Sequence, residues 1–443
     1  MSLVSQTLAV TMLLAWFMSA PEDVRADSIQ NSRETTSPRK KKKRIKKIES
    51  DVYYSSLGAG KTLPEGYFRF RLVNKFSQGD RKINADGSAE NIGFKLTTAA
   101  TAIALEYGMS EALSFQLLVP YLAKNSIAFS SREFKASATF AASKARNEAL
   151  LYQKMQKTGQ CANLAACKTL AQTSTPLAAG SELVLPTGER IDFSGKPANA
   201  VLGSIPDVVT KAAAPAEGEV GLSDIDFGIT YAMINARTQI LSTGLGIRIP
   251  AGPFENVPAA RRPPGQGLML MGLRMNYDLQ PTPALWLSFQ HQAEIMIAEG
   301  KRQKSSILNP DQLNQADPTT EEAIEAGSNG DPNLQSVSRK GIGHTGFLRF
   351  DYGLTDLSRA LQPLALEGAL NYEYGAEPFL GSTKVSGSPQ RYTVAYGAKF
   401  DGLGLQRPFP GYVRILRDRF ISGKNIPIAT SSFIIEFAYY KSF

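Results

Sequence analysis

The feature that most constrains the fold is a series of twelve segments in which apolar and polar residues alternate. A period of two is typical of β-strands whose two faces meet different environments. In one segment, for example, Leu273 and Met275 alternate with Arg274 and Asn276. The expected strands are 66–77, 92–107, 112–124, 223–235, 238–250, 266–279, 284–298, 341–354, 363–375, 390–401, 410–420 and 429–441.

The connections between these segments alternate in length. Every second connection is short, and the others (79–91, 125–222, 251–265, 299–340, 376–389 and 421–428) are mostly long. An even number of antiparallel strands, with tight turns at one end and long loops at the other, is typical of outer-membrane β-barrels. A soluble β-sandwich has no physical reason to sort its loops by side. The sequence therefore predicts an all-β fold, a transmembrane antiparallel β-barrel of about twelve strands over residues 64–443.

The last segment of the chain strengthens this prediction. Aromatic residues recur at every second position toward the end, at Phe437, Tyr439 and Phe443, and the other parity is smaller and more polar. This strand resembles the closing strand of a bacterial outer-membrane barrel, whose terminal aromatic residue belongs to the sorting signal read by the barrel-assembly machinery. An edge strand of a soluble β-protein is the alternative.

Composition is compatible with this fold. Hydrophobic residues make up 43% of the chain and the mean hydropathy is −0.18. After the first twenty residues, no apolar run approaches the roughly 18 residues that a spanning helix needs. The strands of a barrel give only a weak hydropathy signal, because they alternate lipid-facing and lumen-facing residues. Outer-membrane lipid is therefore an expected partner.

The amino-terminal residues predict export. An apolar run from Leu8 to Met18 is followed by small residues suited to cleavage after Ala20 or Ala26, which predicts a signal peptide at residues 1–26. Residues 27–63 contain the run from Arg39 to Lys47, whose eight basic residues leave about +1 of the net charge of +9 for the rest of the chain. We interpret this segment as a disordered periplasmic tail attracted to anionic lipid or cell-wall polymer, with no nucleic-acid partner. A buried amino-terminal helix is the alternative for the first segment.

The long 125–222 connection has features of its own. It begins with an Ala-rich stretch of good helix formers, from Arg132 to Lys157. Cys161 and Cys167 follow, and a disulfide between them is expected in an exported protein if the chain turns there. With only two cysteines and two histidines, a metal site with the usual three or four His and Cys ligands is excluded. The sequence predicts no cofactor.

Four phrases resemble a known family: 105–122 (LEYGMSEALSFQLLVPYL), 243–252 (TGLGIRIPAG), 350–356 (FDYGLTD) and 420–425 (FISGKN). They are similar to segments of the outer-membrane barrels of the meta-pathway phenol-degradation type and, more distantly, of the hydrophobic-compound transporters. The resemblance covers about residues 64–443, although the 125–222 insertion and the basic tail are not part of the family pattern. It implies passage of small, apolar or aromatic compounds across the outer membrane of a Gram-negative bacterium.

An enzymatic barrel is the main competing class. An outer-membrane phospholipase places a serine two residues after its histidine, but Gly346 stands at that position relative to His344. Thr345 cannot replace the serine, because adjacent strand residues face opposite sides. His291 and His344 are therefore interpreted as interfacial or lumen side chains, and the chain is predicted not to be an enzyme.

The polar parities of the strands place charges of both signs inside the barrel. These side chains either form ion pairs that hold the barrel together or form a constriction that selects small solutes by size and field. We expect a passive channel or transporter for small molecules, with the 125–222 insertion as a plug or narrowing. The alternative is a structural or surface-binding barrel that acts through its long outer loops. The expected lumen residues are Arg69, Arg71, Lys95, Asp226, Arg248, Arg274, Glu294, Arg349, Asp351, Glu367, Glu373, Lys399, Arg414, Asp418 and Glu436.

Overall fold

The computed structural model describes residues 62–179, 181–184, 190–215, 217–236, 238–257, 261–303, 334–402, 405 and 409–442. The expected signal peptide and nearly all of the expected basic tail lie outside these residues, as does Phe443. None of the helices in the described segments combines the length and the apolar character that a membrane-crossing helix requires.

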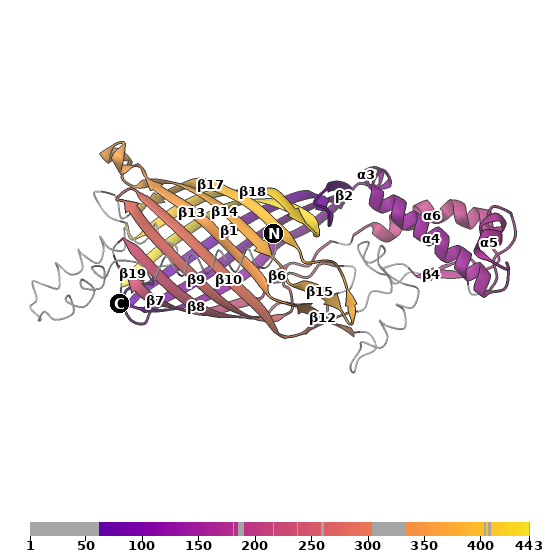
Figure 1. The fold of residues 1–443 in the computed structure, drawn as a ribbon, viewed down its shortest axis with the longest axis horizontal. Helices are drawn as coiled ribbons and strands as arrows, with labels where there is room; N and C mark the ends of the chain where they lie inside the picture. The colour runs from indigo at the N-terminus through magenta and orange to yellow at the C-terminus, as the bar shows by residue number, and fades with distance from the viewer. Residues whose placement is uncertain are drawn as a thin grey trace, which may run out of the picture. The chain divides into compact units, whose positions relative to one another are not determined.

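The predicted barrel is confirmed: twelve antiparallel strands form a closed wall (Figure 1). Each expected strand is present, and most of the boundaries differ by a few residues. The strands are β1 (Tyr67–Ile83), β2 (Ala89–Gly108), β3 (Leu113–Phe129), β7 (Ile225–Asn235), β8 (Gln239–Ile249), β9 (Met269–Thr282), β10 (Leu285–Ala298), β13 (Gly343–Gly353), β14 (Leu364–Tyr374), β17 (Gln390–Asp401), β18 (Gly411–Lys424) and β19 (Ile426–Ser442).

The wall closes between the first and the last strand. β1 pairs with β19 in antiparallel register from Tyr67 opposite Ser442 to Gln78 opposite Ser431. Every other wall strand pairs with the next wall strand along the chain, including β2 with β3. The barrel is therefore an up-and-down meander with one long-range seam.

The two ends of the barrel differ as predicted, with two corrections. Turns 109–112, 236–238 and 283–284 are short, whereas the connections 130–224 and 299–342 at the other end are long. We call these ends the turn side and the loop side. The expected loops at 79–91 and 421–428 are mostly strand, because β1, β2, β18 and β19 continue as hairpins. Asn425 alone joins β18 to β19, in the left-handed region at φ 54°, which asparagine tolerates better than most residues.

The 130–224 connection contains a small helical subdomain. Its elements are α3 (Ser131–Lys135), α4 (Ala138–Lys157), α5 (Leu164–Leu170), the hairpin of β4 (Glu182–Val184) and β5 (Arg190–Asp192), and α6 (Ala198–Ala213). The predicted helix formers are thus helical. Ser137 caps α4 and Asn163 caps α5, since each side chain accepts a hydrogen bond from a backbone N–H of the first turn. A short strand β6 (Gly221–Leu222) then pairs with β3.

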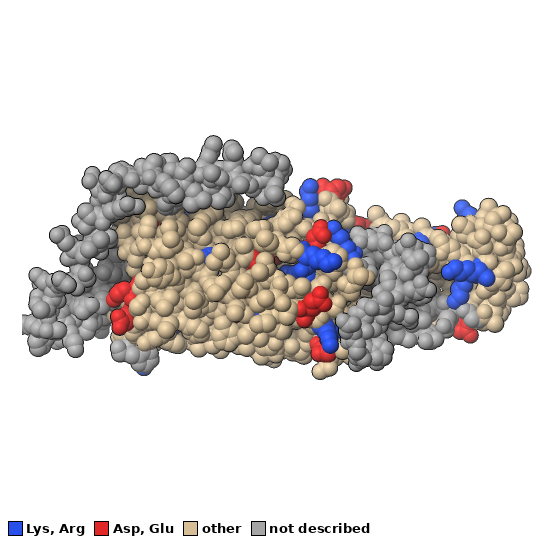
Figure 2. Space-filling model, turned by 60° about the horizontal axis from the view of Figure 1, so that its bottom comes forward, with Lys and Arg blue, Asp and Glu red and all other residues tan. Residues whose placement is uncertain are grey.

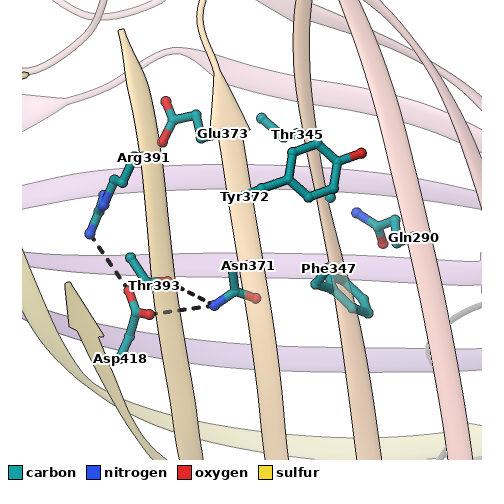
Figure 3. A pocket seen from close by; sticks show the side chains of 10 residues that line it. Gln290, Thr345, Phe347, Asn371, Tyr372, Glu373, Arg391, Thr393 and Asp418 are labelled. Atoms are coloured by element: carbon teal, nitrogen blue, oxygen red, sulfur yellow. Dashed lines mark hydrogen bonds and ion pairs between the residues drawn. The ribbon is translucent and has the colours of Figure 1, made fainter. Parts of the chain in front are cut away.

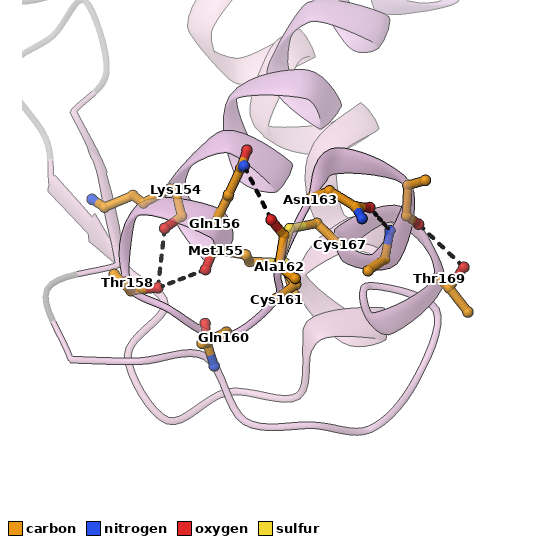
Figure 4. The surroundings of a disulfide bond; sticks show 12 residues. Lys154, Met155, Gln156, Thr158, Gln160, Cys161, Ala162, Asn163, Cys167 and Thr169 are labelled. Carbon is orange, nitrogen blue, oxygen red and sulfur yellow. Dashed lines mark hydrogen bonds between the residues drawn. A yellow bond between two sulfur atoms is a disulfide. The ribbon is translucent and has the colours of Figure 1, made fainter.

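The expected disulfide joins Cys161 to Cys167 (Figure 4). Cys161 lies in the turn after α4 and Cys167 lies on α5, so the chain reverses between them and their Cα atoms are 5.2 Å apart. Cys167 is fully buried. It belongs to a core of Met155, Cys167, Ala171, Leu177, Ala198 and Val201, which gives the subdomain apolar packing of its own.

The subdomain contacts the loop side of the barrel through α3 and the start of α4. The Phe134 ring stacks on Phe94 of β2, with the centroids 6.3 Å apart. The Thr139 backbone N–H donates to Oε1 of Glu90 at 2.8 Å.

The remaining described elements outside the wall are a sheet of β11 (Gly300–Gln303), β12 (Leu334–Lys340), β15 (Glu377–Leu380) and β16 (Thr383–Lys384), and two 3-10 turns, η2 (Leu354–Asp356) and η3 (Arg359–Leu361).

Candidate functional site: the polar interior of the barrel

Each wall strand separates an exposed apolar row from a buried polar row. On β9, Leu273 and Met275 are exposed, whereas Asn276 and Asp278 are almost fully buried. Successive side chains of a strand point to opposite faces, so one row of a closed barrel must point outward and the other inward. The apolar rows therefore form the outer surface, and the polar rows form the interior.

The outer surface matches a bilayer. The face in Figure 2 has a broad belt with few Lys, Arg, Asp or Glu side chains, and charged groups gather toward its ends. Exposed aromatic residues lie near both ends of the strands, such as Tyr107 and Phe400 at the turn side and Tyr374 and Tyr392 at the loop side. An apolar band between aromatic girdles is the signature of a transmembrane barrel of the Gram-negative outer membrane.

The turn-side half of the interior contains a network of ion pairs, which begins on β1 and β2. Glu106 of β2 accepts from both Arg69 and Arg71 of β1, and its Oε1 lies 2.5 Å from Nη2 of Arg71. Nη1 of Arg71 lies 3.5 Å from Oε1 of Glu436 on β19. These groups are mostly buried, so the carboxylates compensate arginine charges that are partly withdrawn from water.

The network continues around the wall through Glu436. Nη1 of Arg414 lies 3.3 Å from Oε2 of Glu436, and Nε of Arg414 pairs with Glu367 of β14. The hydroxyl of Tyr412 donates to Oε1 of Glu436 at 2.5 Å. Four consecutive strands of the wall (β2, β1, β19 and β18) are thereby linked by charged side chains at the turn side, and Arg414 reaches across β17 to β14.

Two further pairs of oppositely charged side chains lie at the same level of the barrel interior. Nε of Arg349 donates to Oδ2 of Asp351 at 2.9 Å, and Nζ of Lys399 lies 3.7 Å from Oδ2 of Asp401. Asp351 is 0% exposed, and Lys399 and Trp286 are each 1% exposed. The interior at this level is therefore packed with side chains.

The opposite wall contributes fewer charges. Arg274 of β9 donates to the Thr230 hydroxyl at 2.9 Å and interacts electrostatically with Glu106, although three strands lie between β9 and β2. Arg248 makes two hydrogen bonds with Asp226, of 2.7 and 3.2 Å. Arg274 thus faces the ion-pair network from the other side of the barrel.

The other predicted residues lie toward the loop side or outside this arrangement. Asp418 lies 3.7 Å from Arg391, and Glu373 is exposed near the loop-side end of β14. Glu294 accepts from the amide of Gln292 at 2.6 Å. Lys95 is exposed and shares the parity of Ile103 and Tyr107, which are exposed on the outer surface, so its assignment to the lumen is corrected.

The error at Lys95 has a structural cause. Ile92, Phe94 and Leu96 suggest an apolar outer row of even-numbered residues at the start of β2, which would turn Lys95 inward. In the structure Ile92 and Leu96 are buried and Phe94 packs against Phe134 of α3, so this apolar row does not face lipid. Phe134, which belongs to a helix beyond the next strand, covers Phe94, and the strand pattern cannot reveal such a contact.

The two histidines lie on outward rows. The His291 and His344 rings stack with their centroids 5.4 Å apart, and Nδ1 of His291 is hydrogen-bonded to the Tyr372 hydroxyl. This agrees with an interfacial role. Within the described segments, no three His, Cys, Asp or Glu side chains are placed to hold a metal ion together.

No protein-family model and no curated protein matches this chain. Among solved structures, it is similar to the COG4313 outer membrane channel from Pseudomonas putida F1, with a TM-score of 0.49 and 11% identity over 86% of this chain and 97% of that chain. It is also similar to the CymD monoaromatic hydrocarbon channel (TM-score 0.31, 9% identity, 86% and 89% covered). A third similar structure is the KdgM porin in complex with disordered oligogalacturonate (0.33, 5%, 85% and 99%). Likenesses this low assign neither a family nor a substrate.

Three interior residues are not among the predicted lumen residues. Glu106, Arg391 and Tyr412 all join hydrogen-bonded or ionic contacts inside the barrel. Glu106 shares its parity with Ala102 and Ala104, so the small-residue row of its strand was the available signal. No sequence signal could have indicated which of these residues meet, because the register between strands decides it.

Proposed function

We propose that the chain is a passive channel or transporter for small molecules in the outer membrane. The observation that supports this most is the contrast between the two faces of one closed wall: apolar rows outside, and rows of charged, amide and hydroxyl groups inside. Ion pairs alone could serve to hold the wall together, but the amides and hydroxyls that line the loop-side half of the interior favour contact with a solute. Facing acidic and basic side chains in a narrow lumen select solutes by size and by field.

The turn-side network is the proposed constriction. Its supporting residues are Arg69, Arg71, Glu106, Glu367, Arg414 and Glu436, with Arg274 facing them. The packing around Trp286 and Lys399 supports a narrow path that admits only small solutes. The apolar or aromatic class suggested by the family resemblance finds little support in this polar lining.

The test is single-channel conductance of the refolded protein in planar bilayers. Arg274→Gln removes a charge that faces Glu106, so we expect larger conductance steps and a reversal potential shifted toward cation selectivity. Lys95→Gln removes the same charge from the outer row and serves as the matched control, which should leave both quantities unchanged. Silence of all three proteins, despite a folded barrel that shifts on unheated gels, would overturn the proposal.

A surface-binding barrel is the second candidate. The observation in its favour is the helical subdomain, which has its own apolar core and disulfide. If binding resides there, the isolated outer loops rather than the lumen would account for the activity.

Assembly is proposed to use the carboxy-terminal strand. Phe437 and Tyr439 are exposed on the outward row of β19, which suits recognition by the barrel-assembly machinery. Phe443 would complete that row. The basic segment within 27–63 is proposed to reside in the periplasm, where it would be attracted to anionic lipid or cell-wall polymer.

A further inference from the structure

A cavity of 240 Å³ (Figure 3) lies in the loop-side half of the wall, whereas the ion-pair network lies in the turn-side half. It has room for several water molecules, and therefore for a small organic solute. Most of its lining is made of inward side chains of β10, β13, β14, β17 and β18, and Gly346 and Tyr372 of the outward rows complete it. The most relevant to its chemistry are Gln290, Phe347, Asn371, Glu373, Arg391 and Asp418.

The register between strands explains why these residues meet. Gln290 is opposite Phe347, Phe347 is opposite Asn371, and Asn371 is opposite Thr393, so four neighbouring strands place one inward side chain each at the same level. Thr345, Glu373 and Arg391 form a second row in the same way. Cross-strand neighbours point to the same face of a sheet, so the two rows form one surface.

Most of this surface is neutral and able to form hydrogen bonds. The amide of Asn371 donates to the Thr393 hydroxyl at 3.0 Å and to Asp418 at 3.4 Å, which fixes its orientation. The Gln290 side chain forms no hydrogen bond within the described residues. The Phe347 ring lies beside it and adds one apolar face.

The charged groups at the cavity balance one another. Arg391 and Asp418 are 3.7 Å apart, and Lys75 of β1 interacts electrostatically with Arg391, Asp418 and Glu373. The lining itself holds one cation and two carboxylates, and Lys75, which lies outside the lining, offsets the remaining negative charge. The cavity therefore has little reason to attract an anion or a cation, and its amides and hydroxyls suit a neutral solute.

We propose that this cavity is a binding subsite for a neutral, polyhydroxylated solute of about monosaccharide size. Hydroxyl groups of the solute would exchange hydrogen bonds with the amides of Gln290 and Asn371 and with the Glu373 carboxylate, and a C–H face of the solute would lie on Phe347. The site lies closer to the loop side than the ion-pair network, so a solute that enters from the loop side meets it first. This inference rests on the proposed function, because it gives a substrate class to that channel.

The test measures binding independently of transport. Full-length protein in lipid nanodiscs is titrated with D-glucose, and saturation-transfer NMR reports the bound sugar. We expect saturable binding that Gln290→Leu weakens roughly threefold to tenfold, the effect of losing about one hydrogen bond. Gln116→Leu makes the same amide-to-leucine change on β3, outside the cavity, and should leave the affinity unchanged.

The possible results distinguish the subsite proposal from the channel proposal. Absence of saturable binding, an equal loss in both variants, or preferential binding of the zwitterion glycine would overturn the subsite. If the protein conducts ions but binds no sugar, only the subsite fails. If it binds sugar at this cavity but never conducts, the channel fails and the subsite stands. Both variants must show the unheated gel shift of a folded barrel before either result counts.

Discussion

At the scale of single residues, the interior depends on carboxylates that are shared between arginines. Glu436 is the clearest case, because it meets Arg71 of β1 and both Arg414 and Tyr412 of β18. A buried group with several partners cannot be removed without leaving those partners unsatisfied. Its removal therefore lowers the stability of the barrel more than the loss of a single exposed ion pair does.

Glu436→Gln is expected to lower the free energy of unfolding by on the order of 3 kcal/mol, because it leaves two buried guanidinium groups without their shared charge. Urea unfolding in lipid vesicles, followed by tryptophan fluorescence, measures this change. Glu377→Gln is the control, since its pair with Lys384 at 2.6 Å is exposed on both sides and should contribute only up to about 1 kcal/mol. Equal losses in the two variants would contradict the structural importance of the network.

At the scale of elements, the strand pattern succeeds where lipid and water act on opposite faces and fails where they do not. All twelve wall strands could be predicted, because each crosses the bilayer with one apolar row. The extensions of β1 beyond Gln78 and of β18 beyond Phe420 could not be predicted. Their residues, such as Asp80, Arg81 and Ser422, carry no apolar row there, so hydrogen bonding continues without the period-two signal.

The candidate site shows the same division. Parity predicts that Glu367, Arg414 and Glu436 lie on polar rows, since parity is a property of one strand, and in the structure all three side chains are mostly buried and ion-paired. The partners could not be predicted, because pairs such as Arg71 with Glu436 depend on the register between strands far apart in the sequence.

The helical subdomain gives a prediction at this scale. Cys161→Ser should destabilise the subdomain by about 2 kcal/mol, the entropy of closing so short a loop. The barrel wall should be unaffected, because the disulfide lies outside it. Limited proteolysis with mass spectrometry should find faster cleavage between α4 and α5 and an unchanged gel shift.

Reduction of the wild-type protein with dithiothreitol is the matched control. Reduced wild type and Cys161→Ser should be cleaved at similar rates, since both lack the same bond. Cleavage of the reduced wild type as slow as that of the oxidised protein would contradict a stabilising role.

At the scale of the whole molecule, the loop side combines a cavity and a folded subdomain. Replacing residues 131–217 with a short Gly-Ser linker retains β3 and the hydrogen bond from Gly218 N–H to the Asn125 carbonyl. We expect this deletion to enlarge the conductance steps, because it removes the helical subdomain, which packs against β2 on the loop side. Planar-bilayer recordings measure the change. Smaller steps from a correctly folded deletion variant would contradict it.

The seam between β1 and β19 has a consequence for how the chain matures. Arg71 and Glu436 lie 365 positions apart, so the contacts that close the wall form only when both ends of the sequence have been delivered. Until then, β1 and β19 are open sheet edges with unpaired N–H and C=O groups, which invite pairing with other chains. Such non-local pairing is also slow. We therefore expect closure of this seam to be a late step of folding, and protection of the two open edges before it to favour a higher yield of folded protein.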